Sequence, residues 1–138
     1  RPDCELFELN PVKTTLTFKV PSKTLTDLEE VSLDNKINPS LLAALAAQES
    51  GFNPRAVSSY RAIGLTQMTH IAEEEIIKTA QEWPRYPGIR KLNFMELKYK
   101  ILSNDINLEN EWRLEPRLSF LGSLYQILKV ALIFHFLF

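Results

Sequence analysis

Residues 38–52 read Asn38-Pro39-Ser40-Leu41-Leu42-Ala43-Ala44-Leu45-Ala46-Ala47-Gln48-Glu49-Ser50-Gly51-Phe52. This stretch predicts a short helix with a defined start and end. Asn38 can accept a backbone hydrogen bond as the N-cap, and Pro39 suits the first helical position. Gly51 can adopt the left-handed conformation that commonly follows a helix. We therefore expect the helix to end just before Gly51, with one carboxylate in its last turn.

That carboxylate belongs to Glu49. Together with Leu42, Leu45 and Ala46 it follows the i, i+3, i+4, i+7 spacing of one helical face, so it continues the apolar stripe. We therefore expect Glu49 to be at least partly buried. Burial disfavours the ionised form, and the helix C-terminus adds partial negative charge, so both effects are expected to raise its pKa as a general acid requires. The alternative is an exposed glutamate that merely ends a helix.

Composition narrows the class of protein. A chain of 138 residues is most simply one domain, long enough to bury a core. The formal net charge is −1 with the signs intermixed, so no nucleic-acid partner is expected. The single cysteine, Cys4, excludes an intrachain disulfide and leaves the redox compartment open. No signal peptide begins at Arg1, so the compartment has to be inferred from the substrate.

The N-terminal part of the chain differs from the rest. Apolar and polar side chains alternate in residues 12–20, which predicts a short strand or an extended arm. Thr26 and Glu29 have the spacing of a capping box, so we expect a helix from there to about residue 35. We accordingly divide the chain into an N-terminal extended arm, residues 1–24, and a mostly α-helical domain, residues 25–138.

Three more helical segments are expected in the second half. Residues 63–83 carry an apolar face at helical spacing, and Asn93 with Glu96 can cap the next helix. Residues 118–138 contain only one side chain charged at neutral pH, Lys129, and are long enough to span a bilayer. Polar side chains inside this run favour a buried core helix, so membrane association is the less favoured alternative.

Other candidate side chains have a structural interpretation. The acidic run at residues 73–75 is typical of a solvated helix face, so it offers no second catalytic carboxylate. His70, expected at the surface or a groove edge, and His135, expected within an apolar helix, have no partners at metal-ligand spacing, so no metal is expected. Trp83 and Trp112 are expected in the core, with stacking on sugar as the alternative.

Two motifs follow one another at fixed spacing. The first is Gln48-Glu49-Ser50-Gly51-Phe52-Asn53-Pro54, and the second is Ala62-Ile63-Gly64-Leu65-Thr66-Gln67, with Ala56-Val57-Ser58 between them. Together they resemble the catalytic signature of the soluble lytic transglycosylases, whose fold is similar to goose-type lysozyme. The strong part of the resemblance covers about residues 37–72. It implies a mostly α, lysozyme-like domain.

The resemblance also implies a site. The motif glutamate is the sole catalytic carboxylate of that family, so both acid and base roles are assigned to Glu49. Ser58 and Gln67 match positions in the sugar-binding groove, where a hydroxyl and an amide can orient acetamido and hydroxyl groups. Their structural alternatives are a loop or N-cap hydroxyl and a solvated helix position.

The implied reaction is cleavage of the MurNAc–GlcNAc bond of bacterial peptidoglycan. It requires no metal or organic cofactor and leaves 1,6-anhydro-MurNAc ends. Peptidoglycan glycan strands are therefore the expected partner, and the substrate implies an exported protein of the periplasm or cell envelope. Two alternatives stay open: a lysozyme-type hydrolase, and a non-catalytic peptidoglycan-binding module of the same fold. Oligomeric state is left open.

This chain departs from the family pattern in two places. Thr66 stands where the family usually has methionine, so we expect sugar packing to differ there. The later Ala-Tyr-Asn-Gly-type motif has no counterpart before Phe138. We therefore expect the domain to be either truncated or divergent at its C-terminus, with impaired activity.

Overall fold

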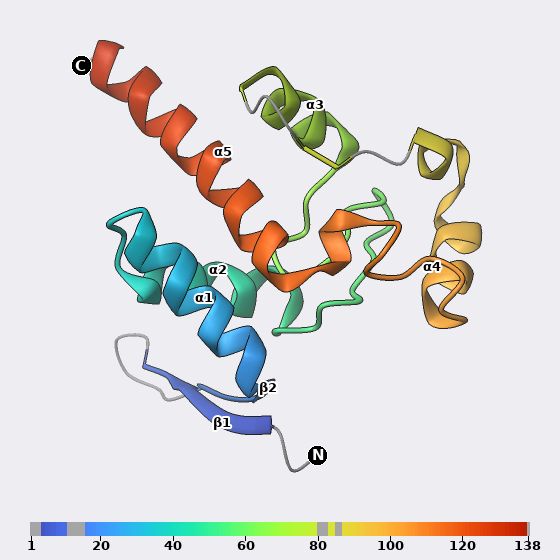
Figure 1. Cartoon of the computed structure of the whole chain (residues 1–138), viewed down its shortest axis with the longest axis horizontal. Helices are drawn as coiled ribbons and strands as arrows, with labels where there is room; N and C mark the ends of the chain where they lie inside the picture. The colour runs from blue at the N-terminus through green and yellow to red at the C-terminus, as the bar shows by residue number, and fades with distance from the viewer. Residues whose placement is uncertain (1–3, 11–15, 80–82, 85–86, 138) are drawn as a thin grey trace.

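The structure is a computed structural model that describes residues 4–10, 16–79, 83–84 and 87–137 (Figure 1). The chain is 55% helical, with a small two-stranded antiparallel sheet at its N-terminus, so the predicted mostly α fold class is confirmed. In chain order the elements are β1 (Cys4–Leu9), β2 (Leu16–Pro21), α1 (Ser22–Asp34), α2 (Pro39–Ser50), α3 (His70–Thr79), η1 (Pro87–Lys91), α4 (Phe94–Leu102), η2 (Trp112–Leu114) and α5 (Pro116–Leu137), where η marks a 3-10 helix.

The N-terminal hairpin packs against the end of α2. β1 and β2 pair antiparallel with Phe7 opposite Phe18. Both rings contact the ring of Phe52, at centroid distances of 5.3 Å and 5.2 Å. The extended segment expected from the alternation is therefore present as β2, although residues 11–15 lie outside the described residues. Its partner β1 was not expected from the sequence.

Helix α1 begins earlier than its sequence indicates. Its N-cap is Pro21, and no side chain makes a capping hydrogen bond there. The predicted capping box of Thr26 and Glu29 is therefore wrong. The Thr26 hydroxyl instead donates to the carbonyl of Ser22 at 3.1 Å, inside the helix. This bond to the residue four positions earlier is a common alternative for threonine within a helix.

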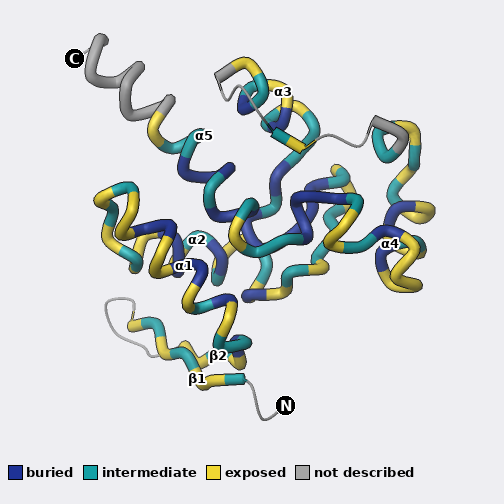
Figure 2. Tube along the Cα trace, in the orientation of Figure 1, coloured by how far each residue is buried: buried dark blue, intermediate teal, exposed yellow. Residues whose placement is uncertain are grey.

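The main core joins the hairpin to α1, α2 and α5 (Figure 2). Helix α1 contacts both α2 and α5. The buried side chains of this core are Val20, Leu28, Val31, Leu42, Ala43, Ala46, Phe52, Leu65, Phe120 and Leu124. Helix α5 thus contributes to the core, as expected, through its described side chains. Among the described residues, no helix has the length and apolar character that crossing a membrane requires.

Residues 63–69, which include most of the second motif, are not helical. A helix was predicted over residues 63–83, but α3 begins only at His70. Ile63 and Met68 exchange two backbone hydrogen bonds, of 3.1 Å and 3.2 Å, which close a tight turn. Gly64 and Gln67 within it have φ angles of 90° and 53°. A right-handed helix cannot accommodate this left-handed backbone, so the first seven residues of the prediction are wrong.

The capping box predicted for α4 is confirmed. The backbone N–H of Glu96 donates to Asn93 Oδ1 at 2.9 Å, and the N–H of Asn93 donates to Glu96 Oε1 at 3.2 Å. These reciprocal bonds satisfy two donors at the helix start. Leu97 and Ile101 are then buried in a second core cluster that includes Ile63 of the turn. The cap therefore fixes α4 against the motif region.

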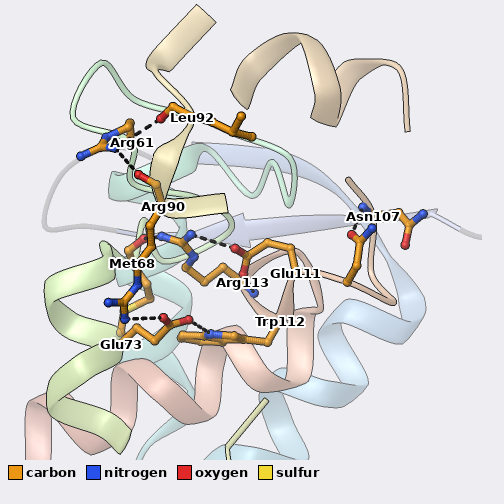
Figure 3. A network of polar contacts seen from close by, with 10 residues as sticks. Arg61, Met68, Glu73, Arg90, Leu92, Asn107, Glu111, Trp112 and Arg113 are labelled. Atoms are coloured by element: carbon orange, nitrogen blue, oxygen red, sulfur yellow. Dashed lines mark hydrogen bonds and ion pairs between the residues drawn. The ribbon is translucent and has the colours of Figure 1, made fainter. Parts of the chain in front are cut away.

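A buried polar network joins α3 to η1 and η2 (Figure 3). Glu73 is only 6% exposed, so the predicted solvated face is wrong at this residue. Its carboxylate accepts from the indole N–H of Trp112 at 2.5 Å and from Arg90 at 3.2 Å. The hydrogen bond that Arg90 donates to the Glu73 carboxylate raises the pKa of Arg90 above its ordinary value. The core placement is confirmed for Trp112, which is buried, and the half-buried Trp83 packs edge-on against it at 5.0 Å.

We expect Gly64→Ala to unfold the protein more easily than Gly51→Ala. A Cβ on Gly64 would lie 2.0 Å from the carbonyl oxygen of Arg113, whereas one on Gly51 would meet nothing within 4 Å. Both positions have positive φ, which costs a side chain about 1–2 kcal/mol. Overpacking adds about 1–3 kcal/mol only at Gly64. Urea denaturation measures the difference, and equal losses of unfolding free energy would contradict this account.

We also expect Glu73→Ala to cost about 2–3 kcal/mol of unfolding free energy, because it leaves the buried Trp112 N–H without an acceptor. Glu74→Ala is the matched control, since Glu74 is the neighbouring residue and pairs with the same Arg90 at 2.7 Å. Its exposed ion pair is worth at most about 1 kcal/mol. Thermal and urea unfolding compare the two variants. A loss for Glu73→Ala no larger than the control would show that the network contributes little.

Candidate active site

The helix that carries Glu49 ends as its sequence indicates. Asn38 Oδ1 accepts the backbone N–H of Ser40 at 2.9 Å, which confirms the N-cap. Gly51 is left-handed with φ 59°. The N–H groups of Gly51 and Phe52 return to carbonyls of the last turn, at 3.0 Å and 3.2 Å. This pairing is the usual glycine helix stop, and it fixes Glu49 in the final turn of α2.

Glu49 itself is exposed, so the prediction that it would be at least partly buried is wrong. The buried side of α2 is formed by Leu42, Ala43 and Ala46. Ser50, four residues after Ala46, lies on the same inward-facing side of α2. Glu49 lies beside this buried side. The apolar stripe seen in the sequence is therefore rotated relative to the true buried face. The carboxylate is accessible to a ligand from solvent.

Ser50 links the two motifs. Its Oγ lies 2.7 Å from the carbonyl oxygen of Leu65 and 3.1 Å from that of Ala46, so the hydroxyl reaches both. The bond to Leu65 spans fifteen residues and attaches the end of α2 to the second motif. Sequence reasoning missed this role. The available signal was the i+4 spacing of Ser50 from a buried alanine.

Ser58 organises the loop between the motifs. Its Oγ accepts the backbone N–H groups of Tyr60 at 3.2 Å and Ala62 at 3.1 Å, and its own N–H donates to the carbonyl of Ala62 at 3.0 Å. The loop-hydroxyl interpretation is thus correct for the structural role of this residue. Within the described residues the hydroxyl proton has no acceptor, so it remains able to donate to a ligand.

Gln67 lies in the tight turn, not on a helix, so the solvated-helix interpretation is wrong. The side chain is half-buried. Its Nε2 donates to the carbonyls of Ala56 at 3.1 Å and Gly64 at 3.0 Å. These bonds join the turn to the loop that contains Ser58. No described group donates to Oε1, which leaves an amide acceptor for a ligand.

Two further side chains of this region were not predicted as functional. Tyr60 is 84% exposed at the tip of the loop that Ser58 closes. Next to it, Arg61 has φ 64° and donates to the carbonyls of Arg90 and Leu92 at 3.0 Å and 3.2 Å (Figure 3). The loop is therefore fixed to the η1 segment while its aromatic ring faces solvent. A tyrosine in a serine-rich loop was the available sequence signal.

The structure explains why threonine suits position 66, where the family usually has methionine. Thr66 is buried, and its Oγ1 lies 3.2 Å from the carbonyl oxygen and 3.0 Å from the hydroxyl of Ser119 in α5. The side chain therefore points into the protein and holds the turn against α5.

The remaining candidates are the two histidines. His70 is half-buried and borders a narrow hollow beside Arg61, Arg90 and Arg113, in agreement with a groove-edge position. The side chain of His135 lies outside the described residues. In the part of the chain that the structure describes, no three His, Cys, Asp or Glu side chains gather as a metal site requires.

One hydrogen-bonded unit therefore carries the three predicted site residues, Glu49, Ser58 and Gln67. It presents an exposed carboxylate, a hydroxyl donor and an amide acceptor, with Tyr60 on the same loop as Ser58. Such a combination of groups suits a polar ligand with hydroxyl and amide substituents, and a sugar ring can pack on an exposed tyrosine.

Comparison with known proteins agrees with this chemistry. Residues 28–90 match the family model described as "Transglycosylase SLT domain", and this segment contains Glu49, Ser58 and Gln67. No curated protein and no solved structure matches the chain. The match supports a transglycosylase-type function on peptidoglycan glycan in general. The resemblance inferred from the two motifs is thereby confirmed: residues 28–90 match the transglycosylase SLT domain model, which is consistent with a lytic transglycosylase or lysozyme-like family.

Proposed function

We propose that this chain is a peptidoglycan lytic transglycosylase that cleaves the MurNAc–GlcNAc bond with Glu49 as its single acid and base. One observation carries the proposal. Ser50, the residue next to Glu49 at the end of α2, donates to the carbonyl of Leu65 in the second motif at 2.7 Å. The candidate acid and the loops with Ser58 and Gln67 are thus held in one framework within the matched segment.

The reaction needs only one carboxylate of the protein. Glu49 protonates the glycosidic oxygen, and the GlcNAc leaving group departs with that proton. The N-acetyl group of the MurNAc ring stabilises the cationic centre at C1. The Glu49 carboxylate then removes the proton of the C6 hydroxyl, whose oxygen bonds to C1. The product end is 1,6-anhydro-MurNAc, and Glu49 is again protonated.

The contacts of two other acids, Glu73 and Asp105, support a reaction with a single catalytic carboxylate. A conventional glycosidase places a second carboxylate across the scissile bond. Glu73 is buried, and its two oxygens accept from Trp112 and Arg90. Asp105 pairs with Lys100 at 3.0 Å. Both carboxylates therefore have structural partners, which favours substrate assistance over a second protein carboxylate.

Ser58, Gln67 and Tyr60 orient the sugar in this proposal. The Ser58 hydroxyl donates to an acetamido carbonyl, and Gln67 Oε1 accepts from an amide or hydroxyl of the glycan. The ring of Tyr60 packs against a sugar face. Because intact glycan strands lie outside the cytoplasm, the proposal includes export to the periplasm or cell envelope.

A peptidoglycan-binding module without activity is the second candidate. The exposure of Glu49 favours it, because catalytic acids are commonly shielded from water by burial. The two candidates make opposite predictions about the release of soluble fragments from the cell wall.

We expect Glu49→Gln to lower fragment release from purified sacculi at least about 100-fold, the usual contribution of a general acid, while binding to sacculi is retained. Glu30→Gln, which changes an exposed glutamate on α1, serves as the control. Mass spectrometry identifies the products: anhydro ends are lighter by one water than hydrolysed ends. Reducing ends alone would identify a hydrolase instead. Binding by the unaltered chain without any release would establish the non-catalytic module.

We expect Tyr60→Ala to weaken binding to glycan strands about tenfold, the equivalent of 1.4 kcal/mol, because a sugar-packing surface is lost. Tyr60→Phe keeps the ring and should bind almost normally. Tyr99→Ala is the matched control, since Tyr99 is 72% exposed on α4. Co-sedimentation with sacculi measures all three variants. Equal losses for Tyr60→Ala and Tyr99→Ala would remove Tyr60 from the site.

A further inference from the structure

A narrow hollow beside the loop that Ser58 closes has no role in the proposed reaction. Its volume is about 10 Å³, roughly the space of one water molecule. The described residues that line it are all basic or apolar: Arg61, His70, Ile89, Arg90, Leu97 and Arg113. We call it the arginine hollow. Its three arginines come from three segments, namely the Ser58 loop, η1 and η2 (Figure 3).

Arg113 contributes a buried donor without a partner. The residue is only 5% exposed. Its Nη1 donates to the carbonyl of Met68 at 3.0 Å, and its Nη2 donates to Glu111 at 2.8 Å. Among the described residues, nothing accepts from its buried Nε–H. Because a buried donor without an acceptor destabilises the folded state, we expect a ligand to supply the acceptor.

Positive charge dominates the wall of the arginine hollow. The carboxylates that pair with Arg90 and Arg113 are not among the described residues that line it. Arg61 donates to two backbone carbonyls and, within the described part of the chain, forms no ion pair with a carboxylate. Helix α3 begins at His70, so its positive end also borders the hollow. The lining therefore favours a negatively charged ligand.

An anion suits these groups better than a water molecule does. A guanidinium group only donates, so it cannot accept either proton of a water. Among the described side chains of the lining, only the His70 ring can accept a hydrogen bond. A halide ion accepts from every donor around it and needs no acceptor itself.

The size of the hollow selects a small ion. Chloride is only slightly larger than water, whereas sulfate and carboxylates consist of several heavy atoms and exceed a volume of about 10 Å³. Arg61, His70 and Arg90 are half-buried, which leaves the hollow accessible from solvent.

We propose that the arginine hollow binds a single chloride ion, held by the guanidinium groups of Arg61, Arg90 and Arg113. The ion accepts the unpaired Nε–H of Arg113. Because each of the three segments provides one arginine, the ion links the Ser58 loop to η1 and η2. Binding is non-covalent and does not depend on the proposed glycan cleavage.

Chloride NMR line widths test this binding on the full chain. The chain should broaden the chloride signal, and bromide should reverse the broadening, whereas sulfate at the same ionic strength should not. Arg61→Gln should weaken chloride binding at least about tenfold, because it removes a charged donor, and Arg61→Lys should restore part of it. Arg55→Gln is the matched control, since Arg55 also donates to a backbone carbonyl but does not line this hollow.

Glu74→Gln should change the affinity in the opposite direction. Glu74 is exposed, does not line the hollow and pairs with Arg90 at 2.7 Å. Glu73 still holds Arg90 at 3.2 Å in this variant, so the guanidinium should keep its place. With one negative charge fewer, we expect chloride to bind about two- to fivefold more tightly.

Thermal unfolding separates chloride binding from a purely structural role of Arg61. At constant pH and ionic strength, the melting temperature should be higher in sodium chloride than in sodium gluconate, because a ligand of the folded state stabilises it. Arg61→Gln should abolish this difference between the salts, even where it lowers both melting temperatures. A purely structural arginine would lower both and leave the difference unchanged, which would contradict the proposal.

Three results of the NMR experiment would overturn the proposal. The first is no broadening by the unaltered chain, which would show that the hollow holds water only. The second is competition by sulfate as strong as that by bromide, which would indicate general attraction to the surface. The third is equal chloride affinity of Arg61→Gln and the Arg55→Gln control.

Discussion

The hydrogen bond from the Ser50 hydroxyl to the Leu65 carbonyl holds the candidate site together. Ser50 faces inward because it continues the line of Leu42 and Ala46 along α2, and its Oγ reaches the second motif at 2.7 Å. The same geometry turns Glu49 to the flank of the helix, where it is exposed. Attachment of the loop and access to the carboxylate are thus two results of one helix orientation.

The turn that receives this bond is fixed from several sides. Gly64 lies so close to the Arg113 backbone that a Cβ would overlap it, and Thr66 bonds to Ser119 of α5. Gln67 joins the turn to Ala56. The second motif therefore depends on η2 and α5, which lie beyond the segment that matches the SLT family. A buried threonine suits this position because its hydroxyl and the hydroxyl of Ser119 in α5 are hydrogen-bonded to each other.

Glu73 and Glu49 have different roles because their surroundings differ. Glu73 is buried because the indole N–H of Trp112 and the guanidinium of Arg90 satisfy its carboxylate. Glu49 has solvent access and lies within the motif framework. One acid contributes to the fold, and the other is free to act on a ligand. This division supports a reaction with a single protein carboxylate.

The sequence by itself determined the features that depend on near neighbours. The ends of α2 and the capping box of Asn93 were predictable because their hydrogen bonds join residues two to six positions apart. Tertiary structure decided the exposure of Glu49, the burial of Glu73 and the turn around Gly64. The bonds responsible cross fifteen residues at Ser50 and thirty-nine at Glu73. Helical spacing shows which residues share one face of a helix. It does not show which face is buried, because contacts with residues distant in the sequence decide that.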